Sequence, residues 1–288
     1  MIRLDAATVM LQWATGGLAF LWVTTRRRIV GVGYGWLLRG VYAAFAVGAV
    51  LAGRAVHPNG VRDGVSAAVA IAAVAVIGVS VVRRRAGVGG QRALAAHRRA
   101  RVAGMTGDSS QDDEPLPGGG REFPPVLDLI APAVGVIGLV AAGLADAGPH
   151  GPAALAIMRT LAGAALMGAV TDAMLLGHWY LVQPGLPRAP LDELTRWVAY
   201  VWPLEVAALL WPTGMASVLS GRIKDGYGGL LGWFWVACVI TTLALCFVTR
   251  AALKERAYSA VMAATGLLYL AILTAFGTDL VARALLAR

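Results

Sequence analysis

Eight long apolar segments divide this chain, and they restrict its fold more than any other feature does. Their lengths are close to or above the roughly 20 residues that a helix needs to cross the hydrocarbon core of a bilayer. The segments are Ala6–Thr24, Gly35–Gly53, Gly64–Val82, Val126–Ala145, Ala153–Leu181, Thr195–Met215, Gly229–Val248 and Tyr258–Ala282. No water-soluble core accommodates all of them, so the sequence predicts a membrane protein.

The apolar segments predict an all-α fold, a polytopic integral membrane bundle of about eight transmembrane helices. Membrane β-barrel strands are about ten residues long and alternate in polarity, whereas these segments are continuous and rich in Ala, Leu, Val and Gly. Glycines within the spans, such as Gly163 and Gly168, let helix backbones approach closely in lipid. We therefore expect a compact helical bundle in contact with the lipid bilayer.

The positive charge of the chain, +9 in total, is distributed by segment. Of the 25 Lys and Arg residues, 17 lie in four alternate segments: Arg26–Arg39, Arg83–Arg121, Arg188–Arg196 and Arg250–Arg256. Cytoplasmic loops accumulate Lys and Arg, so these segments are expected inside and both termini on the extracytoplasmic side. The charge is explained as a topology signal of a multi-pass protein of the cell (plasma) membrane, and no nucleic-acid partner is expected.

One long polar segment interrupts the apolar pattern and sets the expected domain organisation. Residues 1–83 form a three-helix membrane segment, residues 84–125 a cytoplasmic linker, and residues 126–288 a five-helix membrane segment. The first part of the linker is basic and suits the surface of an anionic leaflet. Its second part is rich in Ser, Gly, Pro and acids, which predicts a flexible chain.

Two acidic residues lie within the fifth and sixth predicted spans, Asp172 and Glu205. At a rise of about 1.5 Å per residue, Asp172 lies roughly 9 Å deeper than His178, and Glu205 roughly 13 Å deeper than Arg196. Both distances start from the cytoplasmic interface, so we expect the two carboxyl groups at similar depths on neighbouring helices. Charged residues are costly in lipid and commonly mark ion, proton or ligand pathways. We interpret this pair as the catalytic proton carriers of the protein.

The stretch GHWYLV places His178, Trp179 and Tyr180 near the same interface. A histidine beside two aromatic rings suits the headgroup of a quinone, and Arg196 at the start of the sixth span adds a cation. These four residues are the candidate cofactor-binding set. Histidine and aromatic side chains are also common membrane anchors, and for His178 that interpretation stays open.

Haem is a weaker expectation than quinone. A bis-histidine haem needs two histidines within the membrane, whereas His57 and His150 fall in predicted outer loops and His97 in the linker. A metal site built on His57 and His150 lacks further ligands. The cysteines, Cys238 and Cys246, match no zinc pattern. No metal site is expected, and the identity of any cofactor stays open.

The leading hypothesis is a membrane-embedded subunit of a respiratory-type electron-transfer complex, with a quinone or haem-edge site near the cytoplasmic interface. Since electrons must reach such a site, the hypothesis predicts protein partner subunits. One alternative is a small-solute or proton-coupled transporter in which the same acids line the path. A second alternative is a structural or assembly subunit without chemistry of its own. A lipid enzyme with a polar cluster around His178 is a further possibility.

Overall fold

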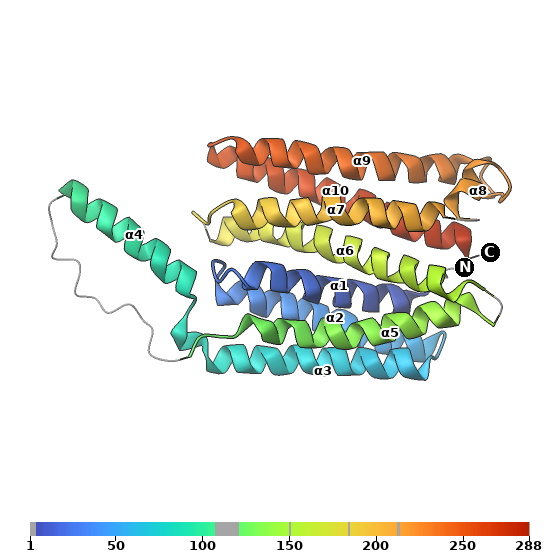
Figure 1. Ribbon diagram of the computed structural model, residues 1–288, viewed down its shortest axis with the longest axis horizontal. Helices are drawn as coiled ribbons and strands as arrows, with labels where there is room; N and C mark the ends of the chain where they lie inside the picture. Colours follow the sequence, from blue (N-terminus) through green and yellow to red (C-terminus); the bar gives the residue numbers. More distant parts are fainter. Residues whose placement is uncertain (1–3, 107–120, 150, 184, 212–213, 288) are drawn as a thin grey trace.

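A computed structural model describes residues 4–106, 121–149, 151–183, 185–211 and 214–287 of the chain. Long helices lie side by side in one bundle, and no strand occurs in the part of the chain that the structure describes (Figure 1). The bundle helices are α1 (Ala6–Thr25), α2 (Val32–Ala55), α3 (Gly60–Val82), α5 (Ile130–Ala147), α6 (Ala153–Val182), α7 (Ala189–Leu210), α9 (Leu230–Lys254) and α10 (Tyr258–Leu286). The predicted all-α membrane bundle is confirmed.

Short helical segments connect the long helices, and one further helix leaves the bundle. They are η1 (Arg84–Ala86), η2 (Pro125–Leu129) and α8 (Met215–Leu219). Helix α4 (Gly89–Thr106) projects beyond the bundle along its long axis (Figure 1). The basic part of the predicted linker is therefore helical, and the rest of it up to residue 120 lies outside the described residues.

Seven of these helices are long and apolar enough to cross a membrane, with η2 and α5 counted as one continuous segment. The exception is α7, which carries acidic and basic residues and packs between α6 and α9 within the bundle. Large apolar side chains point outward from the outer helices: Ile71 on α3 is 69% exposed and Ile240 on α9 is 62% exposed. Such side chains stand in contact with lipid in a membrane, so the bundle has the exterior of a multi-pass membrane protein.

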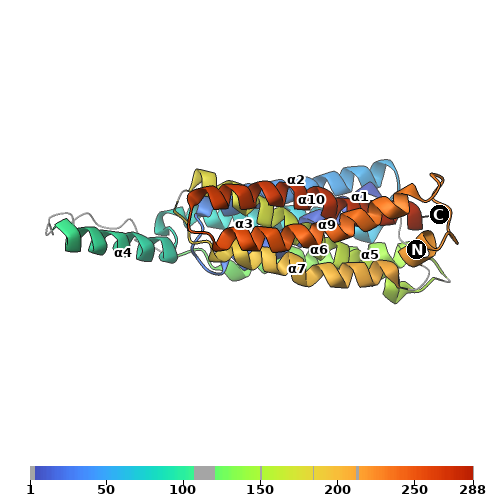
Figure 2. The same cartoon turned by 90° about the horizontal axis from the view of Figure 1, so that it is seen from above.

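The helices pack as two groups of four that lie side by side. Helices α1, α2, α3 and α5 form the first half, and α6, α7, α9 and α10 form the second half. Helices α1 and α6 meet at the centre, while α2 and α10 lie on one side of the molecule and α5 and α7 on the other (Figures 1 and 2). Although α5 follows the linker in sequence, it packs with the three helices that precede the linker.

The contact between α1 and α6 depends on glycine. A Cβ atom on Gly16 would overlap the carbonyl oxygen of Ala164, and one on Gly168 would overlap the backbone of Gly16. On the adjacent face of α1, a Cβ on Gly17 would overlap the ring of Tyr42. Small residues allow this backbone contact, which is the usual way in which helices associate closely in lipid.

The two ends of the bundle carry different helix termini and turns. We call one end the terminal end, because α1 begins and α10 ends there, and the other the basic end, because it carries the α1–α2 turn, α4 and the α6–α7 and α9–α10 turns (Figure 1). Polar side chains cap helices at the terminal end: Asp5 accepts from the amide of Thr8 at 3.0 Å, and Asn59 from that of Arg62 at 3.0 Å. Such caps satisfy amides that have no intrahelical acceptor.

The sixth predicted span is displaced relative to the helix that the structure contains. Helix α7 begins at Ala189 rather than near Thr195, because Pro190 suits its first turn. It ends at Leu210 because Trp211, which precedes a proline, is extended with a ψ of 157°. Pro203 lies inside α7, whereas Pro212 follows the helix and lies outside the described residues.

Candidate functional site

Charged side chains gather inside the second half, near the terminal end. Arg159 of α6, Glu205 of α7, and Asp279 and Arg283 of α10 are each at most 3% exposed. We call these four residues the acid–guanidinium cluster. Buried charges are costly unless they are paired and hydrogen-bonded, and here opposite charges from three helices meet.

Both guanidinium groups of the acid–guanidinium cluster have defined partners. Nε of Arg283 donates to Oδ2 of Asp279, one turn earlier on α10, at 2.7 Å. Arg159 donates to the carbonyl oxygens of Ala208 at 2.9 Å and of Trp211 at 2.6 Å. The last carbonyls of a helix lack an intrahelical donor, so Arg159 also closes the C-terminal end of α7.

The carboxyl group of Glu205 is fully buried and has no hydrogen-bond donor among the described residues. The carboxyl group of Asp279 is close enough to act on it, and Oδ1 of Asp279 also lacks a donor there. Two ionised carboxylates only accept hydrogen bonds. A shared proton, a water molecule or a cation between the two groups would complete the pair, and the charges of Arg283 and Arg159 also act on Glu205.

A glycine and an amide complete the surroundings of this carboxyl pair. A Cβ on Gly163 would lie 2.5 Å from Oδ1 of Asp279 and 2.8 Å from Nε2 of Gln12. Gly163 thus leaves the space into which both side chains extend. Gln12 donates to the carbonyl oxygen of Thr160 at 2.7 Å, while its own Oε1 accepts no hydrogen bond from the described residues.

Asp172 belongs to a second buried group, which it forms with two tyrosines of α2. Its Oδ1 accepts a hydrogen bond from the hydroxyl of Tyr42, and its backbone carbonyl accepts one from Tyr34 at 3.3 Å. All three residues are fully buried, and Oδ2 has no donor within the described ranges. We call these three residues the tyrosine–aspartate group. Its carboxyl group is half satisfied, so it too can hold a proton or a water molecule.

The expectation that Asp172 and Glu205 lie at similar depths is wrong. Glu205 neighbours Asp279, which lies beside Gly163 of α6, nine residues before Asp172. Nine residues correspond to roughly 13 Å of helix. The early start of α7 is the cause, since it places Glu205 close to the terminal end and leaves Asp172 closer to the basic end.

His178 points away from the interior of the bundle. It is exposed, and its Nδ1 lies 3.3 Å from the hydroxyl of Tyr269 on α10, which is itself 44% exposed. The two rings meet edge to face with centroids 6.4 Å apart. His178 lies four residues before the end of α6, so this pair sits near the basic end on the outer surface of the bundle.

The other predicted cofactor residues have separate environments. Trp179 packs against Tyr34 at a centroid distance of 5.8 Å. Tyr180 is buried, and its hydroxyl donates to the carbonyl oxygen of Pro187 in the α6–α7 turn. Arg196 pairs at 3.2 Å with Asp192, one turn earlier on α7. The structure therefore does not bring the four predicted cofactor residues to one place, and His178 has Tyr269 as its polar neighbour instead.

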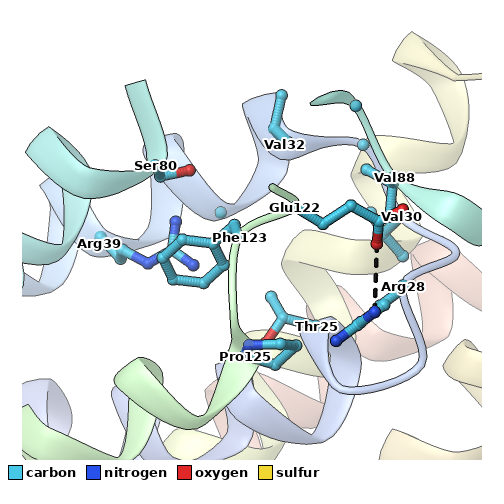
Figure 3. A pocket seen from close by; sticks show the side chains of 13 residues that line it. Thr25, Arg28, Val30, Val32, Arg39, Ser80, Val88, Glu122, Phe123 and Pro125 are labelled. Atoms are coloured by element: carbon cyan, nitrogen blue, oxygen red, sulfur yellow. Dashed lines mark hydrogen bonds and ion pairs between the residues drawn. The ribbon is translucent and has the colours of Figure 1, made fainter. Parts of the chain in front are cut away.

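Ion pairs close the basic end of the first half (Figure 3). Arg39 binds Asp128 through Nε at 2.7 Å and Nη2 at 2.9 Å, and its guanidinium carbon lies 4.6 Å from the ring centre of Phe123. Glu122 reaches across to Arg28 at 3.2 Å. The cavity that remains between these side chains measures about 40 Å³ and has room for little more than water.

A further ion-pair group joins the two halves at the basic end. Glu193 in the first turn of α7 accepts hydrogen bonds from Arg26 and Arg27 in the α1–α2 turn. The hydrogen bond to Glu193 raises the pKa of the Arg27 guanidinium. Glu193 is 8% exposed, so this contact is partly shielded from water, and it ties the start of α7 to the α1–α2 turn.

Sequence reasoning gave no role to four of the residues that complete these groups. Asp279 and Arg283 stand four positions apart in the last apolar segment, and an oppositely charged pair at that spacing inside a span is the signal that identifies a buried ion pair. Tyr42 and Tyr34 give no comparable signal, because tyrosine is common in membrane helices. Their role depends on α2 and α6 both packing on α1, so that the tyrosine side chains of α2 reach α6, which only the fold reveals.

No group of three or more His, Cys, Asp or Glu side chains with metal-binding geometry occurs among the described residues. His178 lies near the basic end and His57 near the terminal end, so they do not form an axial pair. His150, the other histidine of the predicted outer loops, lies outside the described residues.

Comparison with known protein families, with characterised proteins and with solved structures gives no significant match to this chain.

Proposed function

We propose that this protein moves protons within the membrane through the carboxyl groups buried in its bundle. The observation that carries the proposal is the Glu205–Asp279 pair, two neighbouring buried carboxyl groups in which both oxygens of Glu205 and Oδ1 of Asp279 lack donors in the described part of the chain. Such a pair shares or exchanges protons at little cost, and acids of this kind in membrane helices commonly serve proton relays.

A relay along α6 links the two buried groups. The Glu205–Asp279 pair is the proton-binding step nearer the terminal end, and Asp172, hydrogen-bonded to Tyr42, is the step nearer the basic end. The roughly 13 Å between them exceeds the reach of one proton transfer. Water molecules or side-chain motion must therefore bridge the two levels. The ion pairs that close the basic end must also open before a proton can be released there.

Proton flux into proteoliposomes, followed with an enclosed pH-sensitive dye, tests the proposal. Glu205→Gln, Asp279→Asn and Asp172→Asn keep the shapes of the side chains but remove their ability to carry a proton, so each is expected to lower flux by about 100-fold or more. The matched control is Asp192→Asn, because Asp192 is a surface acid at the basic end, paired with Arg196 and Arg250. Full flux in all three buried variants, correctly folded, overturns the proposal.

A quinone-binding subunit of an electron-transfer complex is the second candidate, and His178 with Tyr269 supports it. The two polar groups face the lipid phase, from which a quinone arrives, and they offer hydrogen-bond partners to a quinone carbonyl. This candidate also requires partner subunits that supply or accept electrons.

Lipid extraction of the detergent-purified protein and a reduced-minus-oxidised visible spectrum test the second candidate. Stoichiometric quinone that is lost in both His178→Ala and Tyr269→Phe supports it. Absence of quinone, together with quinone-dependent activity that is unchanged in these variants, rejects it. If the buried acids and His178 are all dispensable while a partner complex still assembles, the protein is a structural subunit.

A further inference from the structure

We infer that three arginines at the basic end, Arg28, Arg83 and Arg92, form a binding site for the phosphate group of an anionic phospholipid. We call these three residues the arginine cage. All three bind Glu122, which comes from the end of the linker and occupies the site as an internal anion. The inference does not depend on the proposed proton-carrying function.

Each guanidinium group of the arginine cage comes from a different element. Arg28 lies in the α1–α2 turn, and its Nη1 is 3.2 Å from Oε2 of Glu122 (Figure 3). Arg92 of α4 donates to the other carboxylate oxygen, Oε1. Nη1 of Arg83, which follows α3, donates to the backbone carbonyl oxygen of Glu122 at 3.2 Å. Every oxygen of Glu122 thus has its own guanidinium donor, and arginine side chains bind the oxygens of a phosphate group in the same way.

Backbone contacts hold the arginine cage in place. The amide of Gly90 in the first turn of α4 donates to the carbonyl oxygen of Arg28 at 3.0 Å, which joins α4 to the α1–α2 turn. Gly89, one residue earlier, has no side chain, and a Cβ atom there would lie 3.0 Å from Oε1 of Glu122. The first turn of α4 therefore leaves space for an anion between Arg28 and Arg92.

The arginine cage carries more charge than its present occupant. Three guanidinium groups meet one carboxylate, while the acid Asp128 at the same end already binds Arg39 through both of its oxygens. Arg84 and Arg85 in η1 are exposed and add to the positive surplus. A cationic surface of this kind at the ends of membrane helices attracts the anionic lipids of the adjoining leaflet.

The present occupant is held loosely enough to exchange with another anion. The side chains of Arg28 and Arg92 are 50% and 30% exposed, and ion pairs in contact with water are weak. Glu122 lies on a non-helical segment, so no helix fixes its position. Glu193 is the contrast at this end, because it also binds two arginines but stands on α7 and is nearly buried. Glu193 is a structural contact, whereas Glu122 can leave its site.

The surface next to the arginine cage is apolar, which favours a lipid over a soluble anion. Ile71, Val74, Gly78 and Val82 are exposed on α3 and stand three or four positions apart, so they share one face of the helix. This face ends at Arg83, the residue that directly follows Val82. A phospholipid can therefore lay its acyl chains along α3 while its phosphate group reaches the cage.

Lipid titration of the purified full-length protein in a neutral detergent tests the inference. We expect acyl-labelled phosphatidylglycerol to bind about tenfold more tightly than acyl-labelled phosphatidylcholine, which has no net charge. The double variant Arg28→Gln, Arg92→Gln should lower the affinity for phosphatidylglycerol to that for phosphatidylcholine. The matched control is Arg250→Gln, Lys254→Gln, which removes two cations at the end of α9, away from the cage. The control should keep the preference for phosphatidylglycerol.

The variant Glu122→Gln tests the site without removing any lipid ligand. Because it removes the internal competitor, we expect phosphatidylglycerol to bind about fivefold more tightly. The matched control is Glu255→Gln, which removes an exposed acid at the α9–α10 turn. This control should leave the affinity unchanged, since Glu255 does not occupy the cage.

Four results would overturn the inference. Equal affinity of the wild-type protein for the two lipids excludes recognition of the phosphate charge. Equal losses in the two double variants show that general charge attraction, not the cage, binds the lipid. Unchanged affinity in Glu122→Gln shows that Glu122 does not compete for the site. Displacement of the labelled lipid by millimolar inorganic phosphate shows that the cage takes free phosphate rather than a lipid.

Discussion

At the scale of single residues, Glu205 stands out because folding removes its carboxyl group from water without supplying a hydrogen-bond donor among the described residues. A buried polar group without partners costs about 1–3 kcal/mol, and a charged group costs more. Buried acids of this kind in membrane helices commonly mark proton, ion or ligand pathways. Asp172 is a milder case, because Tyr42 satisfies one of its two oxygens.

Removing Arg283 measures the pairing inside the acid–guanidinium cluster. Arg283→Met is expected to destabilise the protein by about 3–5 kcal/mol, because it leaves Asp279 as an unpaired buried acid. The double variant Arg283→Met, Asp279→Leu should recover much of that loss, since it removes both charges. Chemical unfolding in detergent micelles compares the two proteins, and a double variant no more stable than the single one contradicts a mutual ion pair.

Tyr42→Phe measures the hydrogen bond on which Asp172 depends. Loss of the hydroxyl leaves both carboxyl oxygens of Asp172 without a donor among the described residues, which is expected to cost about 1–3 kcal/mol of unfolding free energy. Tyr34→Phe is the matched control, because Tyr34 is equally buried but donates to a backbone carbonyl. We expect a loss below about 1 kcal/mol for the control. Equal losses in thermal unfolding would show that packing, not the carboxyl contact, determines the effect.

At the scale of helices, the sequence pattern predicted well which helices occur, and less well the residues at which they begin and end. The apolar segments predicted every bundle helix, because the length needed to cross a bilayer is a strong signal. The helix ends were less certain, because hydropathy falls gradually where polar residues begin and does not mark the terminal residue of a helix. Helix α7 shows the consequence: Pro190 starts it early, and the resulting displacement separates Glu205 from Asp172.

The crossing of α1 and α6 gives a sharp prediction at this scale. Gly168→Ala places a methyl group against the backbone of Gly16. Because backbone atoms cannot move aside as a flexible side chain can, we expect a destabilisation of about 1–3 kcal/mol. Gly266→Ala on α10 is the control, because no atom lies within 4 Å of the added Cβ. The control should be neutral or slightly stabilising, as alanine favours a helix over glycine by up to about 1 kcal/mol. Unfolding midpoints of the two variants decide between these outcomes.

The start of α9 gives a prediction for acid pH. Asp225 accepts hydrogen bonds from the amides of Tyr227, Gly229 and Leu231, each at 2.9 Å, and the amide of Gly229 contributes most to lowering the pKa of its carboxyl group. The stabilisation is therefore complete above the ordinary pKa of about 3.8 and is lost as the pH falls below it. The thermal unfolding temperature of the wild-type protein should fall more steeply below about pH 4 than that of Asp225→Asn. Parallel curves for the two proteins would exclude this contribution.

At the scale of the whole molecule, the arrangement of two halves was beyond what the sequence alone predicted. Spacing within one segment reveals which residues share a face, but not which distant segment covers that face. Tyr42 meets Asp172 across 130 positions of sequence, and Arg283 belongs with Glu205 because α7 and α10 both pack on α6. The chemistry of the candidate site thus arises from helix pairing, whereas its individual acids were visible in the sequence.

The last prediction concerns the orientation of the whole bundle in the membrane. The excess of Lys and Arg at the basic end predicts that this end faces the cytoplasm and that the terminal end faces outward. Tyr227, 66% exposed near the terminal end, and Glu255, exposed at the α9–α10 turn, are suitable reporter positions. In protein lacking Cys238 and Cys246, an impermeant maleimide added to intact cells should label Tyr227→Cys at once and Glu255→Cys only after permeabilisation. The opposite order would place the terminal end in the cytoplasm and reverse the direction in which the proposed relay meets the proton gradient, while leaving the buried carboxyl pair unchanged.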